Sequence, residues 1–193
     1  MEYKNKKNEK NCLSIKNQKE IEPLENLINT NDIIEYISFI LNSIIKNNKK
    51  QKIKQTKGLD EPLYSKYILN LPINKYLIRV IKYTECENNT IIVAFLFMIK
   101  FIKKENFVLG INNVYRLILG MTVLAKKFLE DIGFLNSYYC EIEGMTVKEL
   151  NSIEYSLFTR MNFDMIIKKE DVDEIYQQIY KSLPISRLNE LHL

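Results

Sequence analysis

The segment between residues 112 and 131, NNVYRLILGMTVLAKKFLED, restricts the possible folds more than any other part of the chain. Its apolar residues recur at helical spacing on one side, and the opposite side is apolar as well. A helix that is apolar nearly all round has to be surrounded by other helices. Gly120 and Ala125 would let such neighbours approach closely. The segment therefore predicts a central helix of a bundle, with Lys126 and Lys127 emerging at its polar C-terminal end.

Composition supports an all-α chain with one compact domain and tails. The 193 residues include only five glycines and four prolines, so tight turns are scarce. A sandwich or barrel needs many such turns, whereas a helical bundle needs few. The hydrophobic content of 46% is enough for a core, and the net charge of +4 is mild.

Other patterns predict helices on both sides of the central one. Apolar residues at i, i+3, i+4, i+7 and i+8 predict an amphipathic helix from about Asn74. The apolar run 90–102 fits a buried strand or a buried helix by periodicity, and its length favours the helix. Asn136 is a candidate cap for a short helix, SYYCE. The Thr-x-x-Glu box from Thr146 to Glu149 then predicts the start of another helix.

One further helix is expected on each side of these five. Asp32 is the candidate cap of the first, and Asp171 the candidate cap of the last. The expected organisation is a disordered basic tail (1–29), an N-terminal flanking helix (30–48), a linker with an extended segment (49–71), a five-helix unit (72–165), and a C-terminal helix and tail (166–193).

The residue inventory gives little support to catalysis. The only histidine is His192, so neither a Ser-His-Asp triad nor a histidine-rich zinc site can be built. No phosphate-binding glycine motif is present, and Glu141 and Glu143 are interpreted as solvated loop charges. Three widely spaced cysteines indicate a reducing compartment. We therefore expect a nuclear or cytoplasmic protein that is not an enzyme and has no cofactor, no metal and no membrane partner.

Three strings, in order, resemble the cyclin box of the P/U type, typified by the yeast phosphate-pathway cyclins. They are PINKYLIRVIKY at 72–83, NNVYRLILGMTVLAKKFLED at 112–131 and NSYYCEIEGMTVKELNSIEYSLFTRMNFDM at 136–165. The resemblance covers roughly residues 30–180. It implies a single five-helix box with a buried third helix, and a regulatory subunit that binds and activates a cyclin-dependent protein kinase as a heterodimer.

The resemblance also implies a kinase-binding site. Its Lys at the end of the third box helix and its Glu in the fifth match Lys127 and Glu154, and Phe128, Phe163 and Leu157 complete the expected set. Without the resemblance, spacing alone favours Lys127 as a lysine that complements the helix dipole and Glu154 as an ordinary exposed acid.

Some residues depart from the family pattern. Ile99 occupies the position of the Asp that many cyclins pair with the Arg of the first box helix, so Arg79 has lost that partner. Glu143 replaces the first Gly of a Gly-Gly pair, and Tyr115 replaces a His. An alternative stays open at this point: a cyclin-like scaffold of the transcription-factor type that contacts nucleic acid or other proteins. The mild charge makes nucleic acid the less expected partner.

Overall fold

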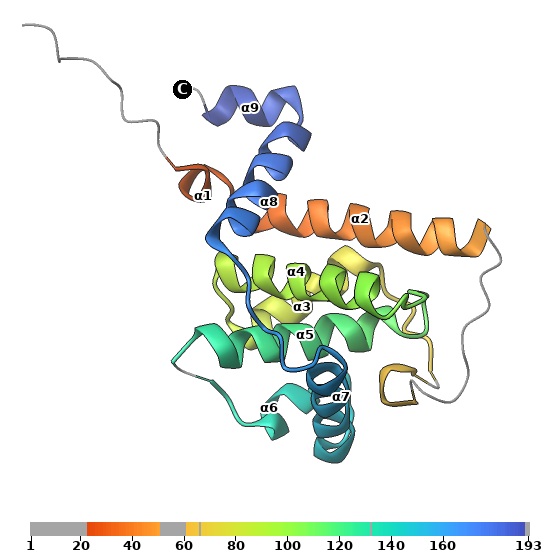
Figure 1. Ribbon diagram of the computed structural model, residues 1–193. Coiled ribbons are helices and arrows are strands. Elements are labelled where there is room, and N and C mark those ends of the chain that lie inside the picture. The colour runs from red at the N-terminus through yellow and green to blue at the C-terminus, as the bar shows by residue number, and fades with distance from the viewer. Residues whose placement is uncertain (1–22, 51–60, 66, 132, 192–193) are drawn as a thin grey trace, which may run out of the picture.

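A computed structural model describes residues 23–50, 61–65, 67–131 and 133–191, and within these ranges the chain forms helices and no strand (Figure 1). The all-α prediction is therefore confirmed. The five helices expected between residues 72 and 165 are α3 (Ile73–Thr84), α4 (Asn88–Lys104), α5 (Val114–Leu129), α6 (Asn136–Cys140) and α7 (Val147–Arg160).

The central helix of the bundle is α5, as its apolar surface predicts. It packs against α3, α4 and α7, and every residue from Val114 to Lys126 except Arg116 is buried. A Cβ added at Gly120 would lie 2.6 Å from Cγ2 of Ile153 and 2.7 Å from Cδ1 of Leu157. The missing side chain thus lets α7 approach α5 directly.

Two long helices flank this unit. The first, α2 (Thr30–Lys50), runs beside α4, and the second, α8 (Lys169–Ser182), crosses both near their N-termini (Figure 1). The Tyr36 hydroxyl on α2 donates a hydrogen bond to Gln178 on α8. The Tyr176 hydroxyl on α8 donates to Asn89 on α4 at 2.8 Å.

Part of the N-terminal segment that was expected to be disordered belongs to the folded domain. Residues 1–29 were expected to be disordered, but Leu24–Leu27 form the short helix α1, and Ile28 is 2% exposed in the core. A single isoleucine in a polar segment has no periodicity, which explains the wrong boundary. Residues 1–22, and residues 51–60 of the expected linker, lie outside the described residues. The 3-10 turn η1 (Glu61–Leu63) follows the second gap.

Asp32 and Asp171 were expected to cap the flanking helices, but each lies three residues after the N-cap position. The Asn29 N–H donates to Oδ2 of Asp32 at 3.1 Å, and the Asp32 N–H donates to Oδ1 of Asn29 at 3.0 Å. Likewise, the N–H of Lys168, the N-cap residue of α8, donates to Asp171 at 3.1 Å. An acid at this third position accepts from the N-cap backbone, so both caps were assigned three residues too late, although α2 begins at Thr30, the expected start of the flanking helix.

The remaining differences are small. A short terminal helix, α9 (Ile185–Leu191), follows α8, and Arg187 on it forms an ion pair with Asp32 at 3.4 Å. Within the described ranges, no helix is long and apolar enough to cross a membrane.

Candidate functional site

Lys127 and Glu154 meet at the surface where the end of α5 lies against α7. Lys127 Nζ is 2.7 Å from Glu154 Oε1, and the side chains are 39% and 12% exposed, respectively. Leu150, Ile153 and Leu157 of α7 are buried, and this packing turns Glu154 toward α5. The structure thus brings together the two charged residues that the family resemblance implied.

Asn136 is a third member of this cluster that the sequence analysis interpreted differently. It was expected to cap α6, but Leu135 is the N-cap residue and Asn136 is the first helical residue. Its Oδ1 accepts a hydrogen bond from Lys127 at 2.7 Å, and its Nδ2 donates to Glu154 and to Asn151. One amide therefore connects both charged side chains and holds α6 against α7.

The aromatic residues expected at the site are exposed, but they are not in contact with each other. Phe128 is 57% exposed and Phe163 is 61% exposed. Phe163 packs edge-on against Phe158, with ring centroids 4.8 Å apart, and the described residues include no ring contact between Phe163 and Phe128. Each aromatic residue thus presents a separate apolar surface.

Leu157 was expected to take part in binding, and the structure corrects this assignment. Its side chain has no exposed surface and lies in the core against α5 at Gly120. A partner cannot touch it without unpacking α7. Leu157 therefore supports the surface from beneath, as one would expect of a residue one turn from Glu154 on the inner face of the same helix.

Phe163 lies in a strained turn that is held in place by contacts from Lys100. Asn162 and Phe163 both have left-handed backbones, with φ of 55° and 59°. Such backbones cost a non-glycine residue roughly 1–2 kcal/mol. Lys100 Nζ lies 2.7 Å from the Asp164 carboxylate and donates to the Asp164 and Ile166 carbonyl oxygens at 3.2 and 3.4 Å. These contacts hold the turn in the geometry that exposes the Phe163 ring.

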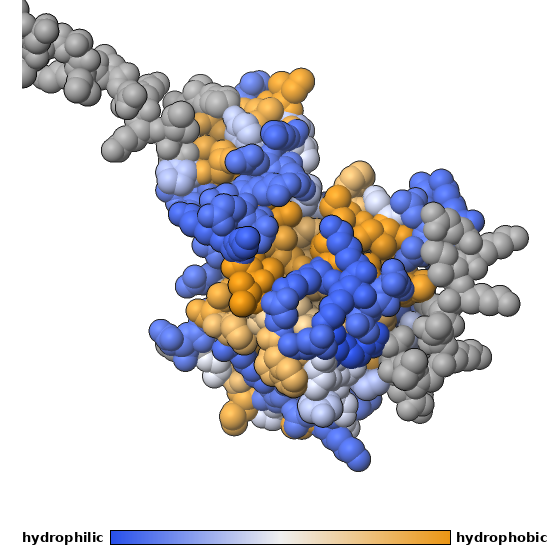
Figure 2. Space-filling view, viewed as in Figure 1, coloured by the Kyte–Doolittle hydropathy of each residue, from blue (hydrophilic) through white to orange (hydrophobic). Residues whose placement is uncertain are grey.

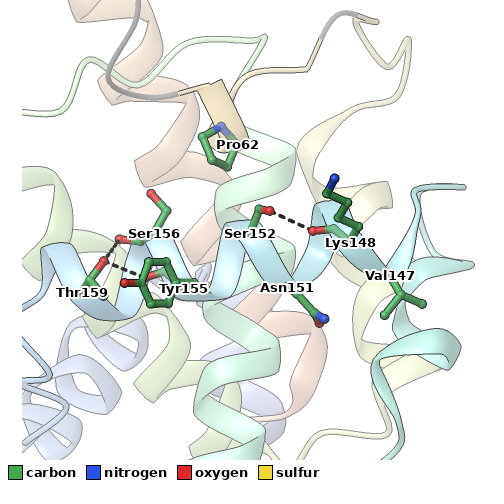
Figure 3. A pocket seen from close by; sticks show the side chains of 8 residues that line it. All are labelled: Pro62, Val147, Lys148, Asn151, Ser152, Tyr155, Ser156 and Thr159. Atoms are coloured by element: carbon green, nitrogen blue, oxygen red, sulfur yellow. Dashed lines mark hydrogen bonds between the residues drawn. The ribbon is translucent and has the colours of Figure 1, made fainter.

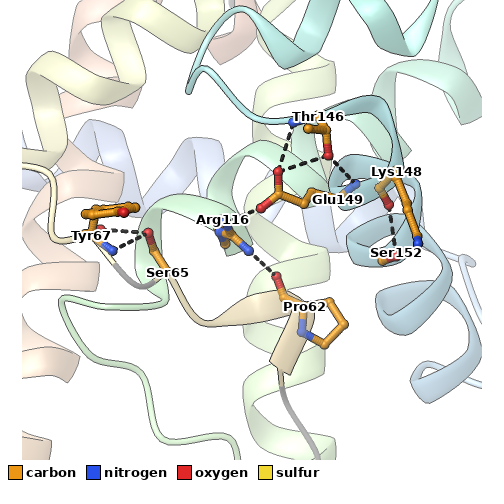
Figure 4. A network of polar contacts seen from close by, with 8 residues as sticks. All are labelled: Pro62, Ser65, Tyr67, Arg116, Thr146, Lys148, Glu149 and Ser152. Atoms are coloured by element: carbon orange, nitrogen blue, oxygen red, sulfur yellow. Dashed lines mark hydrogen bonds and ion pairs between the residues drawn. The ribbon is translucent and has the colours of Figure 1, made fainter.

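The start of α7 is fixed by the polar network in Figure 4. The Arg116 guanidinium donates to the Pro62 carbonyl at 3.0 Å and to Glu149 at 3.2 Å. Glu149 also accepts from the backbone N–H and the hydroxyl of Thr146. Its own N–H donates to Thr146 Oγ1 at 3.2 Å, which completes the predicted capping box. The hydrogen bonds from Thr146, together with Arg116, hold the pKa of Glu149 below its usual value. This network sets the position of α7, and hence of Glu154, relative to α5.

A shallow groove of about 790 Å³ runs along the outer face of α7 (Figure 3). Its lining includes Asn151, Ser152 and Tyr155 from α7, and Pro62 from η1. Tyr155 is 73% exposed. Because Asn151 is bonded to Asn136, the groove continues the surface that contains Lys127 and Glu154.

Lys126, the neighbour of Lys127, was expected to emerge from the bundle but is 3% exposed. Its ammonium pairs with Glu130 and also donates to the Glu85 carbonyl at 3.4 Å. Burial acts to lower the pKa of Lys126, but the hydrogen bond to Glu130 and the charge interactions with Cys86, Glu130 and Tyr139 together outweigh it and leave that pKa raised. Only the second of the two lysines is therefore available at the surface.

Arg79 and Glu143, the two positions that involve departures from the family pattern, have different surroundings in the structure. Arg79 is exposed, its guanidinium lies 6.0 Å from the centre of the Tyr83 ring, and the described residues include no ion pair that involves it. Glu143, interpreted as a solvated loop charge, is instead half-buried and accepts a hydrogen bond from the buried Tyr76 hydroxyl. Burial raises the pKa of Glu143. This bond links α3 to the loop that precedes α7.

Comparison with protein families matches residues 8–165 to the cyclin family. Cyclin-U4-1 of Arabidopsis thaliana is 25% identical over 172 residues, which cover 84% of this chain and 81% of that protein. Cyclin-U4-3 of the same plant is 29% identical over 77% of this chain and 66% of its own length. The PHO85 cyclin-like protein psl1 of Schizosaccharomyces pombe is 26% identical over 75% of this chain and 65% of its own length.

The helices α3 to α7, with α5 at their centre, are thus an all-α cyclin box. The chain belongs to the cyclin family. Its similarity to the plant U-type cyclins and to the PHO85 cyclin-like protein places it in the P/U type, as its sequence strings predicted. The chain spans slightly less than two thirds of Cyclin-U4-3 and of psl1.

Proposed function

We propose that this chain binds and activates a cyclin-dependent protein kinase and has no catalytic activity of its own. The observation that carries the proposal is the internally paired cluster at the surface, in which Lys127 is exposed and Glu154 and Asn136 are partly buried. Charged groups at the centre of an interface have to keep partners, because an unpaired desolvated charge costs several kcal/mol. In this chain, Lys127 and Glu154 are already paired with each other in the absence of a kinase.

The surroundings of this cluster also suit an interface. Phe128 follows Lys127 directly, and Phe163 lies in the fastened turn after α7. Exposed aromatic anchors beside a charged centre often supply most of the binding energy of an interface. Both residues keep more than half of their surface accessible, so each can be buried by a partner.

Activation would follow from the rigidity of this surface. The proposed contact presses α5 and α7 against the regulatory helix of the kinase. The pressure stabilises the arrangement in which the kinase's own Lys–Glu pair and activation segment are in place. Every catalytic group belongs to the kinase in this scheme, and the cyclin supplies only position.

An exchange of charges tests the proposal without removing the ion pair. In the double variant Lys127→Glu/Glu154→Lys, the two residues can still attract each other across the 2.7 Å contact, so the fold should be kept. The pattern of charge presented to the kinase is reversed. We expect the variant to lose co-purification with candidate cyclin-dependent kinases and to lose their activation. Unchanged binding and activation would remove this assignment of the site.

Lys75→Glu/Lys82→Glu on α3 is the matched control, because both residues are exposed on another helix. It should bind and activate like the unmodified chain. A kinase whose own catalytic Asp is replaced should show no activity with this cyclin present. Phosphotransfer that survives that replacement would contradict the regulatory role without catalysis.

A further inference from the structure

The C-terminal halves of α2 and α4 form an apolar seam that no other described helix covers. The two helices run in the same direction, since Thr30 on α2 donates to Asn88 on α4 at 2.8 Å. Tyr36 and Phe95, with ring centroids 6.2 Å apart, mark where their faces meet. Because α8 is bonded to Tyr36 and Asn89, it crosses only the N-terminal halves (Figure 1).

Beyond that crossing, the seam is lined by partly exposed aliphatic residues. Ile40 and Ile44 lie one and two turns after Tyr36 on α2, and Ile99 and Ile102 lie one and two turns after Phe95 on α4. Figure 2 shows a hydrophobic area between these helices with hydrophilic areas on both sides. We call this strip the α2–α4 seam.

Lysines surround the open end of the α2–α4 seam. Lys46, Lys49 and Lys50 are exposed on the last turns of α2, and Lys103 and Lys104 are exposed on the last turn of α4. No ion pair involves these five side chains among the described residues. The nearby acids form ion pairs with other residues: Asp164 pairs with Lys100, and Glu105 pairs with Arg160.

Helix dipoles explain only part of this arrangement. A lysine in the last turn of a helix is favourable by about 0.3–1 kcal/mol. Five lysines at two adjacent helix ends also repel one another, and acidic groups from another molecule would relieve that repulsion. An aliphatic strip with a positive border therefore fits a ligand that offers both apolar side chains and carboxylates.

We propose that the α2–α4 seam is a docking site for an acidic amphipathic segment of another protein. The part of α2 from Ile40 to Lys50 is about 15 Å long, which matches about three turns of a bound helix. Apolar side chains at i, i+3, i+4 and i+7 would lie on the isoleucines, and carboxylates beside them would face the lysines. Beside the strip, Phe39 is the one strongly exposed ring among the described residues of α2 and α4, which is too little for the stacking of successive nucleic-acid bases.

This site is separate from the proposed kinase contact. The cluster of Lys127 and Glu154 is formed by the C-terminal end of α5 and by α7, whereas the seam is formed by α2 and α4 (Figure 1). A cyclin that holds a kinase on one surface and an acidic segment on another could bring that segment's protein to the kinase. The docking inference itself does not depend on the kinase.

The test uses the full chain and a dye-labelled peptide of about 18 residues, with leucines at i, i+3, i+4 and i+7 and glutamates in between. Fluorescence anisotropy should show binding that weakens as salt is raised. The variant Lys49→Glu/Lys103→Glu should weaken binding about tenfold, whereas Lys75→Glu/Lys82→Glu on α3 should leave it within about twofold. Peptide-dependent protection from hydrogen exchange should appear in 40–50 and 96–104.

Three kinds of result would overturn the docking site, the first of which has two forms. One is no binding, or equal weakening by both pairs of variants. Another is equal binding of a scrambled peptide of the same composition, which would mean that charge alone acts. The third is that a single-stranded oligothymidylate binds the same lysines more tightly than the peptide, which would make the patch a nucleic-acid surface. The Lys127→Glu/Glu154→Lys variant should bind the peptide normally, so the two proposals can fail independently.

Discussion

Gly120 on α5 and Ile153 on α7 are so close that a Cβ at Gly120 would lie 2.6 Å from the Ile153 side chain. Ile153 is fully buried, so the methyl group can be accommodated only if α7 moves or the side chain leaves its rotamer. We therefore predict that Gly120→Ala destabilises the fold by about 1–3 kcal/mol, despite the better helix propensity of alanine. Chemical denaturation measures this change.

Gly133→Ala is the control for this substitution, because a Cβ there meets nothing within 4 Å. It should change the free energy of unfolding by less than about 0.5 kcal/mol. Because α7 carries Glu154, Gly120→Ala should also weaken kinase binding under conditions where the variant is still folded. A Gly120→Ala protein as stable as the unmodified chain would contradict the close packing of α5 and α7.

Asn136 should matter for kinase binding although it need not touch the kinase. Asn136→Ala removes the amide that bridges Lys127 and Glu154 and leaves Asn151 without its partner. We predict a loss of about 1 kcal/mol in stability and a drop in kinase affinity of about fivefold to tenfold. Isothermal titration with the kinase measures the affinity. Ser137→Ala, at the exposed neighbouring position, should leave both quantities unchanged.

Phe163 and Leu157 should respond to truncation in opposite ways. Leu157→Ala leaves a cavity in the core and should cost about 2–5 kcal/mol of stability. Phe163→Ala removes a mostly exposed ring and should cost about 1 kcal/mol or less while weakening kinase binding by about 2 kcal/mol. Thermal melts and titrations on both variants check the contrast. Equal loss of stability would place Phe163 in the core.

The turn that presents Phe163 depends on Lys100. Lys100→Met keeps the apolar stem but removes the ammonium that contacts Asp164 and Ile166. Because the ion pair is largely exposed to solvent, we predict only a small loss of stability. Hydrogen exchange in 162–167 should become faster, and kinase affinity should fall part of the way toward that of Phe163→Ala. Unaltered exchange would show that the turn holds its left-handed backbone without Lys100.

Glu143 should make stability depend on pH. Burial raises its pKa, so the folded protein keeps the proton at pH values where the unfolded chain has lost it. The stability that this group contributes is fully present below the unfolded pKa and falls as the pH rises through the folded pKa. Glu143→Gln cannot titrate and can still accept from Tyr76. Its melting temperature, relative to the unmodified chain, should therefore rise as the pH increases from the ordinary glutamate pKa of about 4.3 through the raised folded-state pKa of Glu143.

Much of the fold was predictable because the spacing of apolar residues indicates which side of each helix is buried. The apolar surface of α5 required neighbours on all sides, and the structure supplies α3, α4 and α7. Errors arose where the signal was local. At Asp32 and Asp171, a capping residue and an acid three positions later look alike in sequence, so two N-caps were assigned to the wrong residues. Ile28 is an isolated apolar residue, and its burial depends on elements distant in sequence.

The candidate site was predictable only through the family resemblance. Spacing cannot show that Lys127 and Glu154, which are far apart in the chain, lie 2.7 Å apart. The role of Asn136 was hidden because its position also fits a helix cap. Leu157 has the same apolar character whether it faces a partner or the core, and only the packing of α7 against Gly120 distinguishes the two.

The position of Glu154 beside the core residues of α7 has a consequence for abundance in the cell. Leu150, Ile153 and Leu157 hold the domain together on the inner side of α7. Glu154 lies at the edge of that side, where it meets Lys127 of α5. A ligand that binds only the folded chain stabilises it by mass action. A partner at this surface would therefore protect the cyclin from unfolding and from proteolysis, so the amount of partner would set the lifetime of the chain. Mutational surveys that measure only cellular activity would therefore not separate two effects of substitutions in α7. One is weaker binding of the partner, and the other is a shorter lifetime of the chain.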